Sequence, residues 1–167
     1  MPSDELKIGQ AFLDDARAQL QLCRQRLLHC VDQLNDEQLW WRAGEQFNSI
    51  ANLMLHLAGN VGQRIGSLIG GLPNHRNRDQ EFAERGPIPK AELLQLLDDA
   101  LESADAVLAQ LAPQRLLETR TYPMLRGPVE GTFVTLILQT LVHLGGHTQE
   151  IVSLTRLQLR ETYRFMQ

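Results

Sequence analysis

The chain has 167 residues, a formal net charge of −4 at pH 7 and 43% hydrophobic residues. This length predicts one domain, residues 1–167, with a sizeable core. The acidic balance excludes a broad basic surface, so we expect neither nucleic acid nor a membrane as a partner. Met1 to Glu5 lacks the features of a secretory signal, and no run reaches the ~18 apolar residues of a membrane span, which together favour a cytoplasmic protein.

The first predicted helix carries apolar residues at alternating spacings of three and four from Leu13 to Leu34. This spacing is typical of a bundle helix. Cys23 and Cys30 lie on that apolar seam, ~10.5 Å apart along a helix, which is too far for a disulfide. They are expected to be small buried residues in a reducing compartment.

The pattern stops between Asp32 and Asn48, where we predict an ordered connection held by burial of Trp40 and Trp41. A second helix should begin after a cap at Ser49 or Asn48 and end near Ile69, before Gly70 and Gly71. Its apolar residues form one broad arc, and a polar stripe lies opposite. The members of this stripe are Ser49, Asn52, His56, Asn60, Gln63 and Ser67. The stripe must face either water or a polar pocket.

The second half of the chain predicts two more helices. A long polar loop, Pro73 to Pro89, precedes a helix with an apolar seam from Leu93 to Leu111. The connection that follows is rich in proline and glycine, with one short extended piece at Thr119 to Tyr122. Thr132 should cap a last helix that ends as late as Leu159, and the aromatic tail either extends it or docks on the bundle. The expected fold is therefore all-α, a four-helix bundle.

His143 and His147 lie one turn apart in the apolar last helix, and Glu150 falls on the same face within an arc of about 60°. Two imidazoles in an apolar setting require partners. A divalent metal ion would use both, with His56 as a third ligand from another helix. Hydrogen bonds to backbone carbonyls, with Glu150 at the surface, would satisfy them equally well. The residues alone leave both interpretations open.

Other motifs in the sequence give weaker indications of function than the three histidines. The His143 to His147 segment has the spacing of a metalloprotease helix but lacks the glutamate after the first histidine. Its Gly145 and Gly146 suggest a close approach of a neighbouring helix. His29 is expected to be solvated, and His75 is expected to be an ordinary loop residue.

The order of these segments resembles the DinB-like superfamily of four-helix metal-binding proteins. The resemblance rests on Ser49 to Leu57 and on His143 to Ile151, and the helix order extends it over nearly the whole chain. It implies a three-histidine site for zinc, nickel or a similar divalent ion. Carried over to this sequence, the ligands are His56, His143 and His147. Family members commonly pair as homodimers, so the resemblance also implies a homodimer.

Characterised relatives use low-molecular-weight thiols, which implies a metal-dependent enzyme that activates such a thiol or water, as an S-transferase or a hydrolase acting on a small-molecule substrate. Glu150 would then be a base beside the ligands or an additional ligand. Four basic residues are candidate anchors for an acidic thiol cofactor: Arg64, Arg78, Arg120 and Arg126. Two alternatives are a non-catalytic metal-binding or stress-related dimeric bundle, and an interaction module without metal. A closed ligand shell that includes Glu150 would favour the non-catalytic protein, and an open position lined by arginines would favour the enzyme.

Overall fold

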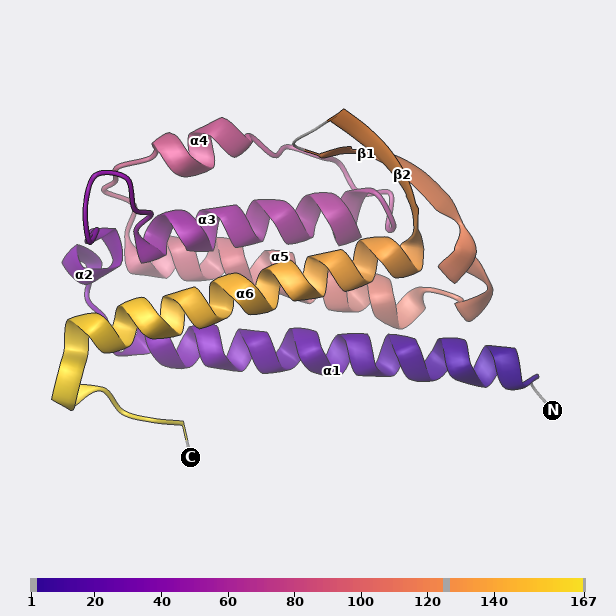
Figure 1. The fold of residues 1–167 in the computed structure, drawn as a ribbon, viewed down its shortest axis with the longest axis horizontal. Helices are drawn as coiled ribbons and strands as arrows, with labels where there is room; N and C mark the ends of the chain where they lie inside the picture. Colours follow the sequence, from indigo (N-terminus) through magenta and orange to yellow (C-terminus); the bar gives the residue numbers. More distant parts are fainter. Residues whose placement is uncertain (1–2, 125–126, 167) are drawn as a thin grey trace.

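Four long helices form a bundle in the computed structural model, which describes residues 3–124 and 127–166 (Figure 1). They are α1 (Asp4–Asp32), α3 (Ile50–Val61), α5 (Lys90–Gln110) and α6 (Phe133–Leu159). Both α1 and α3 contact α5 and α6, which puts α1 diagonally opposite α3. The predicted all-α, four-helix architecture is confirmed. Within the described ranges, no helix combines the length and the apolar character needed to cross a bilayer.

Short elements connect and cover the bundle. They are α2 (Asp36–Trp40), the π-helix η1 (Gly62–Ser67), α4 (Arg78–Ala83), the 3₁₀-helices η2 (Pro113–Leu117) and η3 (Arg160–Thr162), and the strands β1 (Thr119–Met124) and β2 (Gly127–Thr132). In Figure 1, α4 lies over α3, and the hairpin of β1 and β2 lies at the end of the bundle where α6 begins.

Helix starts follow the predicted caps. Ser49 accepts a hydrogen bond from the backbone N–H of Asn52, and the Asn52 side chain accepts one from Ser49, which makes a capping box for α3. Thr132 accepts from the backbone N–H of Thr135 and caps α6. Asn52 also donates to the carbonyls of Glu81 and Glu84, at 2.9 and 3.0 Å. The cap of α3 therefore fixes α4 above that helix.

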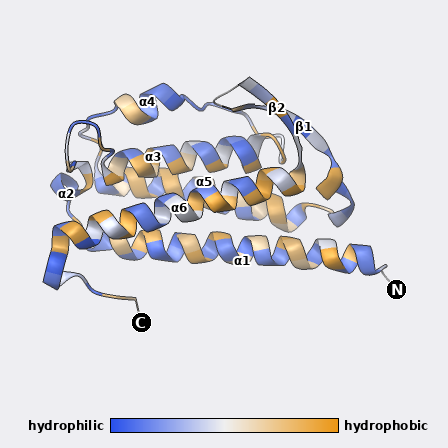
Figure 2. Cartoon of the chain, in the orientation of Figure 1, coloured by the Kyte–Doolittle hydropathy of each residue, from blue (hydrophilic) through white to orange (hydrophobic). Residues whose placement is uncertain are grey.

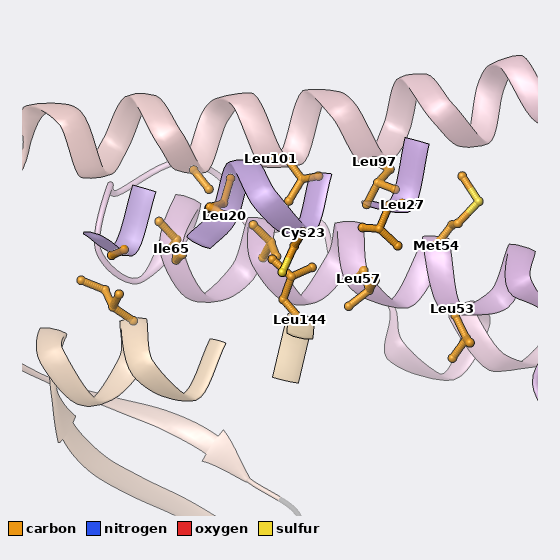
Figure 3. Packing of buried hydrophobic residues seen from close by; sticks show 14 of the residues in the cluster. Leu20, Cys23, Leu27, Leu53, Met54, Leu57, Ile65, Leu97, Leu101 and Leu144 are labelled. Atoms are coloured by element: carbon orange, nitrogen blue, oxygen red, sulfur yellow. The ribbon is translucent and has the colours of Figure 1, made fainter. Parts of the chain in front are cut away.

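The core is built from the apolar stripes of the long helices. Hydrophobic and hydrophilic residues alternate around each of these helices in Figure 2, as expected of amphipathic segments. Figure 3 shows Leu20, Cys23 and Leu27 of α1 packed among leucines of the other helices. Both cysteines are buried and free, as predicted. Burial raises the pKa of each thiol.

Two ion pairs join the outer sides of α1 and α5. Arg17 donates to Asp105 from Nε and Nη2, both at 3.0 Å. Arg24 likewise donates from Nε and Nη2 to the two carboxylate oxygens of Asp98, at 2.7 and 2.8 Å. The hydrogen bond from Arg24 holds the pKa of Asp98 below its usual range. Because the helices are antiparallel, equal seven-residue steps along each bring both pairs into register.

The connections contain more structure than the sequence predicted. The segment after α1 folds into α2, with Trp40 half-buried and its Nε1 donating to the Ile88 carbonyl at 3.2 Å. Trp41 is 40% exposed, so aromatic burial holds only for Trp40. The polar loop contains α4. The second predicted helix reaches Val61 as α-helix and continues as η1, whose wider hydrogen-bonding pattern the apolar spacing did not reveal.

The short extended piece is half of a hairpin, in which Thr119 pairs with Thr132 and Met124 with Gly127. The second strand was missed because Gly127, Pro128 and Gly131 are residue types depleted in strands. At the other end of the chain, Tyr163 packs on the core, which confirms the docked form of the aromatic tail.

Candidate metal centre

Three imidazoles from two helices converge between α3 and α6. They belong to His56, His143 and His147, and their potential ligand nitrogens all lie within 4.8 Å of one another. The Nε2 atoms of His56 and His143 are 2.8 Å apart. The His143 and His147 rings are 4.5 Å apart between centroids and nearly perpendicular, at 89°. The structure therefore brings together all of the sequence-predicted metal ligands.

Two of the rings are oriented by carboxylates. Nδ1 of His56 lies 2.8 Å from Oε2 of Glu81, and Nδ1 of His147 lies 2.7 Å from Oε2 of Glu150. An ionised carboxylate can only accept hydrogen bonds, so the ring nitrogen that faces it must carry a proton. We therefore assign the proton to Nδ1 in both rings. The Nε2 atom of each ring then carries a lone pair. This carboxylate–histidine arrangement is the one that metal-ligating histidines usually have.

The third ring is held neutral by its surroundings. Burial, together with the neighbouring His147 and His56, lowers the pKa of His143 from 6.5 to about 4. At neutral pH this imidazole therefore carries no charge, and a neutral ring is the form that binds a metal ion.

A buried arginine supports the carboxylate beside His56. The Arg76 side chain is 8% exposed and donates to both oxygens of Glu81, at 2.8 and 3.0 Å. It also donates to Gln63 at 2.9 Å. Burial tends to raise the pKa of Glu81, but hydrogen bonds from His56 and Arg76 outweigh it and lower that pKa. Glu81 is therefore an ionised carboxylate in a nearly dry setting.

Sequence analysis missed both Glu81 and Arg76, because the polar loop that carries them has no periodicity to single them out. The available signal was the polar stripe of the second predicted helix, which required a partner surface. The structure confirms a polar pocket for that stripe, since Asn52 and His56 are buried beneath α4. The Phe82 ring of α4 lies 4.7 Å from the His56 ring between centroids and closes this side.

A cavity of about 850 Å³ opens beside the histidines. Parts of α3, η1, the loop before α4, β1 and α6 surround it. Its lining residues are His56, Asn60, Gln63, Arg64, Arg76, Arg78, Pro123, Met124, Leu138, Gln139, Val142 and His143. A cavity of this volume accommodates an organic molecule.

The predicted arginine anchors are only partly brought together. Arg64 and Arg78 line the cavity. Arg120 does not: it lies 3.5 Å from Glu118 and over the Phe133 ring. Arg120 is four positions along β1 from Met124, which lines the cavity, and this corresponds to roughly 13 Å. Arg126 lies outside the described residues.

Three smaller expectations have different outcomes. His75 is an exposed loop residue, as predicted. His29 is half-buried and its Nε2 contacts the carbonyl of Arg164, so the expectation of a solvated ring is wrong. A close helix approach at Gly145 and Gly146 is also wrong, because a Cβ at either position would meet open space.

Comparisons with known proteins agree with this fold. The model of the family described as "Protein of unknown function (DUF1572)" matches residues 7–167. No curated protein matches the sequence significantly. A conserved protein from Enterococcus faecalis superposes with a TM-score of 0.70 at 15% identity, covering 86% of this chain and 95% of that chain. A DinB-like protein, YjoA, from Bacillus subtilis superposes with a TM-score of 0.66 at 16% identity, covering 92% and 98%. These likenesses confirm the DinB-like fold.

Proposed function

The chain belongs to the DUF1572 family of proteins of unknown function, and we propose that it binds a divalent metal ion through His56, His143 and His147. The observation that carries the proposal is the convergence of three imidazoles, two of which hydrogen-bond through Nδ1 to a carboxylate. The donor set fits the ion: three neutral nitrogens suit zinc or nickel, and three protein ligands leave a position open. The likeness of the sequence to DinB-like proteins supports the same ligands.

We propose further that the site is catalytic. The cavity adjoins His56 and His143 and contains arginines, as expected of an open position. The Glu150 carboxylate bonds to His147 and is 44% exposed on its side chain, which does not favour a closed shell. A divalent ion at this site would lower the pKa of a bound thiol or water. The corresponding reaction is S-transfer or hydrolysis: the thiol or water gives its proton to solvent, its sulfur or oxygen forms a bond to the electrophilic centre, and the bond from that centre to the leaving group breaks, so that the leaving group departs with the electron pair.

The chain's own residues divide this work. The histidines hold the ion, and Glu81 with Arg76 fixes the His56 ring. We assign Glu150 as a positioning residue for His147, because its Oε2 accepts a hydrogen bond from Nδ1 of that ring and Glu150 is not among the residues that line the cavity. The apolar side chains of Met124, Leu138 and Val142 line the cavity beside the histidines.

A homodimer is part of the proposal. The side of α6 away from the core exposes Leu138, Val142 and Leu157, and Gly145 and Gly146 lie among them with open space beside each Cα. Exposed apolar side chains gathered on one face mark a site of protein–protein contact, so a second copy would cover this face. This surface adjoins the cavity, so a second copy would also narrow its mouth.

The proposed function is tested by elemental analysis of purified protein, followed by assays with a panel of low-molecular-weight thiols and electrophiles. We expect bound zinc or nickel, and thiol consumption that a chelator abolishes and the same metal restores. His147→Ala should lose both metal and turnover, whereas His75→Ala, in the exposed loop, should keep both. Metal without turnover for any thiol or for hydrolysis would leave the non-catalytic metal-binding bundle as the function.

A further inference from the structure

Arg64 is a cation for which the described part of the chain supplies no counterion. Its guanidinium is half-buried and donates to Oε1 of Gln139 and to Sδ of Met124, both at 3.1 Å, and it lies 5.0 Å above the Tyr122 ring. Within the described ranges no carboxylate lies at ion-pair distance from it. Burial lowers the pKa of Arg64, because it disfavours the charged form of the guanidinium. A charge held this way is stabilised by an anion that enters with a ligand.

The charge of the cavity lining also favours an anionic ligand. Arg76 is neutralised by Glu81, but Arg64 and Arg78 are not paired with a carboxylate in the part of the chain that the structure describes. None of the described lining residues is acidic. The cavity is therefore positive inside a chain whose net charge is −4. Attraction of anions here is local to the cavity and opposes the overall charge.

Asn60 supplies a second, independent indication of a ligand. It lines the cavity one turn beyond His56 and is 6% exposed. Its Oδ1 is buried and has no hydrogen-bond partner among the described residues. A buried amide oxygen left unpaired is unfavourable, so such groups in native proteins usually have a use. A hydrogen-bond donor on a ligand would satisfy it.

The opposite side of the cavity is apolar. We call Pro123, Met124, Leu138 and Val142 the apolar rim. Leu138 and Val142 belong to α6, and the other two belong to β1. A purely ionic ligand would leave this rim in water, whereas a ligand with a hydrocarbon or ring portion would cover it.

We propose that the cavity binds an amphiphilic organic anion that also carries a hydrogen-bond donor. Its negative group pairs with Arg64 and, nearer the surface, with Arg78. Its apolar body lies against the apolar rim, and its donor reaches Oδ1 of Asn60. The inference rests on the proposed function only in treating this ligand as the substrate of the metal site, since the binding itself depends on arginines that are not metal ligands.

A matched pair of fluorescent probes tests the inference. 8-Anilinonaphthalene-1-sulfonate carries an apolar ring body, an N–H donor and a negative group, and N-phenyl-1-naphthylamine is its uncharged analogue. On chelator-treated protein we expect one saturable site that binds the anionic probe about tenfold more tightly than the neutral one. Arg64→Gln should weaken the anionic probe by about tenfold, the effect of one lost charge-assisted hydrogen bond, and leave the neutral probe nearly unchanged.

Two control variants locate the effect. Arg26→Gln removes the same charge from the exposed side of α1. Arg156→Gln acts in a shallow depression near Tyr163 and Phe165, which is the competing place for an aromatic anion. Neither should change the affinity of the anionic probe. Equal affinities of the two probes, or a loss at Arg156→Gln in place of Arg64→Gln, would overturn the proposal. If Arg64→Gln does not fold, Arg78→Gln at its exposed position should weaken the anionic probe by a smaller factor, and no weakening there would overturn it equally.

The same titrations separate this inference from the metal site. His147→Ala should lose metal and still bind the anionic probe as the wild type does. A protein that binds no metal but discriminates the probes through Arg64 refutes the proposed function and leaves the anion site standing. Metal binding with no preference for the anionic probe would support the proposed metal site and refute the anion site.

Discussion

The Nε2 atoms of His56 and His143 lie 2.8 Å apart, although the residues are 87 positions apart in the chain. Glu81 at Nδ1 of His56 directs the lone pair of that ring towards His143, whose own ring is neutral. A neutral His143 ring can carry its proton on Nε2 and donate to that lone pair, and a divalent ion would take the place of this proton between the two rings. Neighbouring residues keep the two rings in this position. Arg76 donates to the Glu81 carboxylate, and Asn52 donates to the Glu81 backbone carbonyl and so fixes α4.

The two supporting carboxylates should differ in importance. Glu81→Gln is expected to weaken metal affinity by about 10–100-fold, because the acceptor at Nδ1 of His56 loses its negative charge, and also to lower stability, because Arg76 is left buried without its counterion. Glu150→Gln should weaken metal affinity with little effect on folding, since Glu150 is partly exposed. Competition with a chromogenic chelator and thermal unfolding of both variants would measure the two effects. A stability loss at Glu150→Gln as large as at Glu81→Gln would contradict this division.

Metal should stabilise the folded protein, because the ligands come from two helices that separate on unfolding. At a free ion concentration 100 times the dissociation constant, the expected gain is about 2.7 kcal/mol. Differential scanning fluorimetry of chelated and metal-loaded protein would show it as a higher melting temperature. The gain should vanish in His56→Ala and persist in His75→Ala, and a gain of equal size in both variants would place the ion elsewhere.

Asn60 should cost stability in the absence of a ligand. Replacing it with leucine, which has a similar size, removes the unpaired buried Oδ1 and adds apolar surface next to the core. We expect Asn60→Leu to raise the free energy of unfolding of the ligand-free protein by about 1 kcal/mol. Urea unfolding of wild type and variant measures this difference, and a destabilised variant would show that the amide has a structural partner.

The bond between Arg24 and Asp98 predicts a pH-dependent contribution to stability. Because the folded-state pKa of Asp98 is lowered, the contribution is complete above its unfolded-state value of about 3.9 and is lost as the pH falls towards the lower folded-state pKa. Asp98→Asn should cost about 1 kcal/mol at pH 7 and progressively less in acid. Asp99→Asn, exposed on the same helix, is the matched control and should cost little at any pH. A cost for Asp98→Asn that stays constant down to pH 2 would be inconsistent with the pair.

The sequence singled out the three histidines that converge in this site, but not the residues that support them. His56 could be found because it lies in the polar stripe opposite the apolar arc of its helix, and His143 and His147 because their spacing puts them on one face. Glu81 and Arg76 come from a loop with no repeating pattern, and only the fold brings that loop over α3. Arg120 was grouped with Arg64 by charge alone, although the hairpin places it near Phe133 and away from the cavity.

The starts of α3 and α6 depend on hydrogen bonds between residues that are close in the sequence, so they could be predicted from the sequence alone. Ser49 and Thr132 begin helices because their side chains cap backbone N–H groups that otherwise lack partners. The hairpin and η1 depend on contacts between distant segments, such as Arg64 with Met124, which no short window of sequence contains.

Calorimetric titration of zinc or nickel into chelator-treated protein tests the central claim most directly. The account predicts about one ion per chain for the wild type and for His75→Ala, and no specific binding for His143→Ala, which removes one of the three ligands. One tightly bound ion per chain in His143→Ala would contradict the three-histidine centre.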